Sequence, residues 1–266
     1  MIHPMPTADV LERRRLAVGP HAVDVRGPSG TGPGAPGARP LVLVHGIGVS
    51  GDYFLPLAEV LAAGHEVHVV DLPGYGGTPR PPRPLGVGEL AEVLAGTVAA
   101  LGLQAPVLLG HSMGCQVVVD AIAGHPGLAA GYVLLGPTVD PRARSLPAQA
   151  WRLARDTLRE PPRTNAVIFR DYARMGLVRY LRTSRSMLAD RIEADIARCD
   201  VPGLVVRGGR DPIAPRAWVR QLAAAAPRAR SAEVPGAPHA VQHVRPRELA
   251  AVITPFLEAL STGPAA

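Results

Sequence analysis

The pentapeptide Gly110-His111-Ser112-Met113-Gly114 constrains the fold more than any other segment of the chain. It stands between the apolar run 106–109, typical of a buried strand, and the run 115–119, typical of a helix. Two glycines permit the sharp strand-to-helix turn that lifts a serine hydroxyl clear of a sheet and points new helix amides at a reacting atom. A G-x-S-x-G pattern alone is weak evidence, but these flanks supply the strand and the helix that the turn requires. We therefore predict that Ser112 is a nucleophile, and a purely structural turn is the alternative.

A nucleophilic serine requires a base and a carboxylate that orients the base. Asp211 directly follows a buried-strand pattern, and His239 stands in a loop after a late, short strand pattern. The order serine, aspartate, histidine along the chain suits groups that come from successive strands of one sheet. We predict that Ser112, Asp211 and His239 are catalytic. Asp140, which follows the sixth predicted strand, is the alternative acid.

Acyl transfer also requires donors for the negative charge that develops on the reacting oxygen. An apolar run ends in the turn His45-Gly46-Ile47-Gly48, which suits a backbone amide donated by Ile47. The second expected donor is the amide of Met113, directly after the predicted nucleophile. His45 and His111 flank these positions, and we interpret both as packed turn residues rather than bases.

Apolar runs alternate with amphipathic runs along most of the chain. The alternation stops from 141 to 198, where the sequence predicts three or four amphipathic helices. Such a pattern predicts a mostly parallel sheet of eight strands with helices on both faces, in the α/β class. We expect a core domain (1–140 and 199–266) and a helical cap (141–198) inserted after the sixth strand, above the carboxyl ends of the strands. The Gly- and Pro-rich segment 27–40 is expected to be a surface connection. The strands are predicted at 16–18, 22–26, 41–45, 66–71, 106–110, 131–135, 203–207 and 229–234, and the core helices at 52–63, 87–101, 113–123, 216–225 and 246–260.

From about His21 to about Leu260 the chain resembles the α/β-hydrolase superfamily. The resemblance implies the α/β-hydrolase fold, with Ser112 as nucleophile, His239 as general base and Asp211 as its orienting carboxylate. It also implies that the amides of Ile47 and Met113 bind the oxyanion and that no cofactor is needed. One departure is Cys115, which stands where many relatives have a further glycine. The motifs that carry the resemblance are His45-Gly46-Ile47-Gly48, Asp71-Leu72-Pro73-Gly74-Tyr75-Gly76-Gly77-Thr78, the Ser112 pentapeptide, Gly209-Arg210-Asp211-Pro212 and Pro238-His239-Ala240.

Positive charge is concentrated in the predicted cap. Residues 141–191 hold twelve arginines and four acidic residues, a formal charge of +8 in a chain whose total is +6. Such a charge can steer an anionic or carrier-linked small-molecule substrate to the site. The alternative is a general preference for arginine, because the chain contains no lysine. The basic segment has no recognition motif for nucleic acid, so no nucleic-acid partner is predicted.

Other sequence features exclude several classes of protein. No run approaches the roughly 18 apolar residues of a membrane span, and no signal-type stretch follows Arg13, Arg14 and Arg15, so we expect a cytoplasmic protein without a membrane partner. The two cysteines, Cys115 and Cys199, do not suggest a disulfide framework. Histidines and acids show no metal-ligand spacing, and the Gly-rich turns lack the ending of a phosphate loop. No metal and no cofactor are therefore predicted.

The expected reaction is hydrolysis of an ester or thioester of a small to medium, partly apolar substrate through an acyl-enzyme. The serine at position 112 excludes the epoxide-hydrolase and haloalkane-dehalogenase type, which attacks its substrate with an aspartate. A carbon–carbon bond hydrolase or lyase on the same scaffold, or a receptor without catalysis, stays open as an alternative. Aromatic residues are expected to line the substrate pocket, although a stripe at helical spacing is also compatible with a cap core. These residues are Tyr53, Phe54, Trp151, Phe169 and Tyr172.

Overall fold

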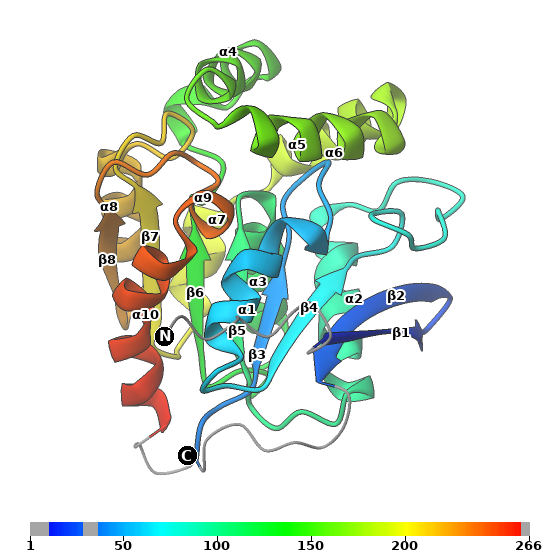
Figure 1. The fold of residues 1–266 in the computed structure, drawn as a ribbon, viewed down its shortest axis with the longest axis vertical. Coiled ribbons are helices and arrows are strands. Elements are labelled where there is room, and N and C mark those ends of the chain that lie inside the picture. The colour runs from blue at the N-terminus through cyan, green and yellow to red at the C-terminus, as the bar shows by residue number, and fades with distance from the viewer. Residues whose placement is uncertain (1–10, 29–36, 262–266) are drawn as a thin grey trace, which may run out of the picture.

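An eight-stranded sheet forms the centre of the computed structural model, which describes residues 11–28 and 37–261 (Figure 1). The middle of the predicted surface connection therefore lies outside the described residues. Strand order is β1-β2-β4-β3-β5-β6-β7-β8, with β2 antiparallel to both β1 and β4 and every other pair parallel. The predicted mostly parallel, eight-stranded sheet is confirmed. The strands are β1 Leu11–Val18, β2 His21–Pro28, β3 Leu41–Val44, β4 Val67–Asp71, β5 Val107–His111, β6 Gly131–Leu135, β7 Gly203–Gly208 and β8 Ala229–Val234.

The edge strand β1 is longer than the sequence pattern suggests. Its extra residues include arginines, which a strand tolerates at the edge of a sheet because their side chains reach solvent. The guanidinium groups of Arg13 and Arg15 also bind the buried carboxylate of Asp24 on β2, with Nε to oxygen distances of 3.0 and 2.6 Å. These ion pairs join the two strands where the apolar pattern is absent.

Helices cover both faces of the sheet, and the alternation of side chains along each strand supplies both interfaces. On β3, Val42 and Val44 pack in one apolar cluster with α2 and α3, whereas Leu41 and Leu43 pack in the other with α1 and α10. Strands buried on both faces explain the continuous apolar runs in the sequence. These core helices are α1 Leu55–Leu61, α2 Val87–Ala100, α3 Met113–Gly124, α8 Arg216–Ala225, α9 Val241–Val244 and α10 Pro246–Ser261.

Four α-helices lie between β6 and β7, and Figure 1 shows α4, α5 and α6 together at one end of the sheet. Every exposed large apolar side chain of the described residues belongs to this segment. No helix in the described part of the chain is long and apolar enough to cross a membrane. The four helices are α4 Leu146–Thr157, α5 Pro162–Met175, α6 Leu177–Ala189 and α7 Ile192–Asp195.

Candidate active site

Ser112 lies on a strained turn between the end of β5 and the start of α3. Its backbone has φ 55° and ψ −120°, a conformation that residues with a side chain rarely adopt. A Cβ added at Gly110 would collide with the carbonyl of Gly114, and one added at Gly114 would collide with the carbonyl of Val44. Both glycines are therefore required by close backbone contact, as the pentapeptide predicts.

His239 and Asp211 are hydrogen-bonded to each other. Asp211 follows β7 and His239 follows β8, and the Nδ1 of the imidazole lies 2.8 Å from Oδ2 of the carboxylate. The other carboxylate oxygen accepts hydrogen bonds from the amides of Ile213 and Ala214, at 2.7 and 3.0 Å. This arrangement holds the Nδ1–H tautomer of the imidazole, so that Nε2 is the nitrogen that can exchange a proton in the pocket.

Electrostatics keep this pair charged. Burial lowers the pKa of His239, but the charge and hydrogen bond of Asp211, together with the charges of Asp156 and Glu160, outweigh it and raise the pKa to about 9. Burial raises the pKa of Asp211, and the charge and hydrogen bond of His239 outweigh that effect and lower it below its usual range. The imidazole is therefore a stronger base than an ordinary histidine.

The other candidate residues have different partners. Asp140 accepts a hydrogen bond from Arg152, with a nitrogen to oxygen distance of 2.7 Å, and does not contact His239. His45 donates from Nδ1 to the carbonyl of Gly46 at 2.8 Å and accepts at Nε2 from the Leu72 amide at 3.1 Å. Both nitrogens of His45 are thus occupied within the turn, as expected of a packed residue.

A small cavity of about 60 Å³ brings Ser112 and His239 together. Ile47 also lines this cavity, and Gly46 packs so closely that an added Cβ would lie 2.9 Å from the Cβ of Ser112. Met113 is the first residue of α3, and the first amides of a helix have no acceptor within the helix. The two predicted oxyanion donors thus belong to the turn after β3 and to the first residue of α3, and their role stays a prediction.

The five aromatic residues expected in the substrate pocket separate into three groups. Tyr53 and Tyr172 line the cavity beside the serine. Phe169 lines a second, larger cavity among the helices that follow β6, which Tyr172 also lines. Phe54 and Trp151 line neither cavity: Phe54 is fully buried in the core beside α1, and Trp151, on α4, is 66% exposed.

Two acidic residues not predicted from the sequence hold the histidine loop. Oδ1 of Asp156, on α4, accepts a hydrogen bond from the His239 amide at 3.2 Å, and Oε1 of Glu160 accepts one from the Ala240 amide at 2.8 Å. Burial raises the pKa of Asp156 to about 6 and that of Glu160 to about 8. Asp156 lies in the last turn of α4 and Glu160 just after the helix ends, and no motif in the sequence distinguishes either residue.

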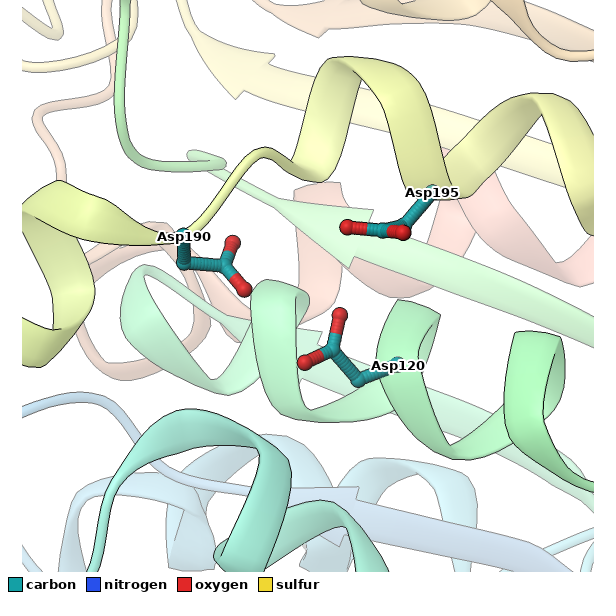
Figure 2. A group of neighbouring side chains, drawn as sticks. All are labelled: Asp120, Asp190 and Asp195. Carbon is teal, nitrogen blue, oxygen red and sulfur yellow. The ribbon is translucent and has the colours of Figure 1, made fainter.

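Three aspartates form a second group of titratable residues, away from the serine cavity. Figure 2 shows the carboxylates of Asp120 on α3, Asp190 after α6 and Asp195 on α7 facing a common space, with ligand atoms within 4.8 Å of one another. Burial and the neighbouring carboxylates raise the pKa of Asp120 to about 7, and burial raises that of Asp190. The sequence shows no metal-ligand spacing that would indicate this group of carboxylates. None of the three lines the cavity at Ser112.

Comparison with known proteins gives a family and several relatives. Residues 41–252 match the model of the "Alpha/beta hydrolase family". The chain is 31% identical over 229 residues to pimeloyl-[acyl-carrier protein] methyl ester esterase of Xanthomonas campestris pv. campestris (strain B100), which covers 75% of this chain and 87% of the relative. It is 25% identical over 280 residues to 2-(acetamidomethylene)succinate hydrolase of Mesorhizobium japonicum, and this alignment covers 92% of this chain and 95% of the relative.

Solved structures share the fold. A membrane phospholipase A superposes with a TM-score of 0.80 at 20% identity, covering 96% of this chain and 88% of the other. A thermophilic esterase from Thermogutta terrifontis superposes with a TM-score of 0.78 at 22% identity, covering 94% and 100%. At these identities the likeness concerns the fold alone.

Proposed function

The chain belongs to the alpha/beta hydrolase family, and from that premise we propose that it is a serine hydrolase that cleaves an ester or thioester through an acyl-enzyme. The observation that carries the proposal is that the strained Ser112 lines one cavity with His239, which is hydrogen-bonded to Asp211. A serine in this setting has a base within the same pocket, and the base has a carboxylate that orients it.

In the proposed reaction, Oγ of Ser112 attacks the carbonyl carbon while Nε2 of His239 takes the hydroxyl proton. The amides of Ile47 and Met113 donate hydrogen bonds to the oxyanion. His239 then gives the proton to the leaving alcohol or thiol, and an acyl-serine remains. A water molecule, deprotonated by the same nitrogen, attacks the acyl-serine and releases the acid and free Ser112.

We further propose that residues 1–140 and 199–266 form the catalytic core and that 141–198 form a cap over it. Gln149 and Leu153 on α4 and Tyr172 on α5 line the same cavity as Ser112, which supports this division. The cap would shield the reacting carbonyl from bulk water and supply part of the substrate pocket.

The pH dependence of hydrolysis tests the proposed base. Because the charge of Asp211 holds a proton on His239 up to a pKa of about 9, kcat/KM for p-nitrophenyl acetate should rise with pH and level off only above that value. The measurement is an initial-rate profile from pH 6 to 10.5, corrected for hydrolysis without protein. A corrected rate that does not change over this range contradicts the assignment of His239 as base.

The charge of the cap supports a finer proposal, that the substrate is anionic or linked to an acidic carrier. The relative from Xanthomonas campestris is named for an acyl-carrier protein ester, and the cap of this chain carries a formal charge of +8 over residues 141–191. Some cap arginines are neutralised, such as Arg152 by Asp140, whereas Arg155 and Arg159 form no ion pair with any described residue. These two guanidinium groups, one on α4 and one just after the helix ends, are thus available to attract an anion.

Salt dependence tests this finer proposal. Between 20 and 200 mM NaCl, kcat/KM for a coenzyme A thioester should fall roughly tenfold, while that for a neutral ester of equal acyl length changes less than about twofold. The double variant Arg155→Glu/Arg159→Glu should lower the rate with the thioester selectively. Arg228→Glu/Arg230→Glu, at the far edge of the sheet, is the matched control. Equal salt profiles for both substrates would remove the steering proposal.

A further inference from the structure

Two cavities of very different size meet beneath α4, α5 and α6. The cavity at Ser112 measures about 60 Å³, and the second, among the three helices, measures about 830 Å³. We call the larger one the cap groove. The two are adjacent and share five lining residues, namely Gln149, Leu153, Tyr172, Tyr180 and Met187.

The cap groove is apolar and open to solvent. Phe169 and Leu177, which line it, are 54% and 72% exposed. Of its polar side chains, Gln149 donates to the carbonyl of Ala143 at 2.8 Å and Thr157 donates to that of Leu153 at 2.9 Å, so both are already hydrogen-bonded. A soluble protein rarely leaves a connected apolar surface of this kind in water unless a ligand or a partner covers it.

We propose that the cap groove binds a flexible hydrocarbon chain attached to the reacting carbonyl, so that the substrates are esters or thioesters with an extended apolar chain. This inference rests on the proposed function of Ser112. The small cavity has room for little more than the reacting group, and the cap groove is an adjacent apolar space large enough for a chain that extends past the shared residues. The five residues that the cap groove shares with the cavity of the nucleophile favour the substrate itself as the occupant over a second copy of the protein.

Two series of esters test the proposal and identify the side of the carbonyl that carries the chain. One series is p-nitrophenyl acylates from acetate to dodecanoate, and the other is alkyl acetates from methyl to dodecyl. In one series kcat/KM should rise about two- to threefold per added methylene, because each methylene leaves water for a partly open apolar surface. If the rate does not depend on chain length in either series, the proposal is overturned.

A pair of substitutions on α5 locates the effect. Ala173 lines the cap groove, and Ala166 is exposed on the same helix outside the groove. Ala173→Trp should fill the cap groove. In the series that responds to chain length, it should lower the ratio of kcat/KM for the longest ester to kcat/KM for the shortest at least tenfold, whereas Ala166→Trp should leave that ratio within about twofold of the wild-type value. Equal ratios in the two variants would overturn the proposal.

A binding measurement separates this proposal from the proposed function. Calorimetric titration of Ser112→Ala with alkyl carboxylates from butanoate to dodecanoate should give affinities that rise with chain length and are lost in Ser112→Ala/Ala173→Trp. If no ester is hydrolysed but this binding is seen, the cap groove is supported and the hydrolase proposal fails. If short esters are hydrolysed and dodecanoate does not bind, the cap-groove proposal alone fails. A dimer in sedimentation that Ala173→Trp dissociates, without chain binding, would assign the cap groove to self-association and overturn the proposal.

Discussion

Ser112→Ala is expected to lower kcat for an ester substrate by a factor of about 10⁴ to 10⁶ while the protein stays folded. The loss is large because the hydroxyl of Ser112 supplies the atom that attacks the carbonyl. Alanine is no more strained than serine at φ 55°, so the melting temperature should change by no more than a few degrees. The measurement is steady-state hydrolysis of p-nitrophenyl esters together with a thermal melt.

A fluorophosphonate probe provides an independent readout of the same residue. It should label the wild-type protein and Ser231→Ala, whose serine is exposed on β8, but not Ser112→Ala. Labelling that persists in Ser112→Ala would assign the nucleophile elsewhere. A folded wild-type protein that is neither labelled nor active would favour the alternative of a ligand receptor without catalysis.

Asp211→Asn is expected to lower kcat at least about 10³-fold, whereas Asp140→Asn should cost less than about tenfold. The carboxylate of Asp211 accepts a hydrogen bond from Nδ1–H of His239. An asparagine amide in its place removes the negative charge that stabilises the imidazolium. Asp140 instead binds Arg152, so its replacement changes a contact of α4 rather than the base. The check is steady-state kinetics of both variants at one pH.

The pH profile of Asp211→Asn gives a second, mechanistic readout. Removing the negative charge beside His239 should lower the pKa of the imidazole from about 9, and the rising limb of kcat/KM should move to lower pH. If the rising part of the kcat/KM profile does not shift, or if Asp140→Asn loses more kcat than Asp211→Asn, the orienting acid would be assigned to Asp140, in the loop after β6.

The sequence predicts the sheet and the meeting of Ser112, Asp211 and His239 for one physical reason. The carboxyl ends of parallel strands lie at the same edge of a sheet, so polar residues that directly follow such strands become neighbours. Their positions along the chain therefore indicate their positions in space. The strand patterns at β3, β5, β6 and β7 are strong because each strand is buried on both faces.

Residues on helices are predicted less well because the phase of a helix depends on where it begins. The sequence suggests one helix over 52–63, but a 3-10 turn at Gly51–Phe54 precedes α1, which begins at Leu55 with Pro56 in its first turn. Proline fits there because the first amides of a helix need no acceptor within it. The change of helix type turns Phe54 into the core instead of toward the substrate pocket.

Contacts between distant segments are not accessible to pattern analysis at all. Asp120 and Asp190 are 70 positions apart, and only the packing of α3 against the helices that follow α6 brings their carboxylates together. The same applies to Asp156 and His239, which are 83 positions apart. Neither pair has a spacing or a motif that distinguishes it from ordinary charged surface residues.

The hydrogen bonds from the histidine loop to Asp156 and Glu160 limit which segments of this chain could be replaced in a chimera. If the segment between β6 and β7 were replaced with one that lacks these two acids, the buried amides of His239 and Ala240 would lose both acceptors, and an unpaired buried amide costs about 1–3 kcal/mol. A chimera would therefore have to inherit the two acids together with the histidine loop. With the roles proposed for the cap and for His239, substrate range and catalytic geometry would be linked traits that recombination transfers as one unit.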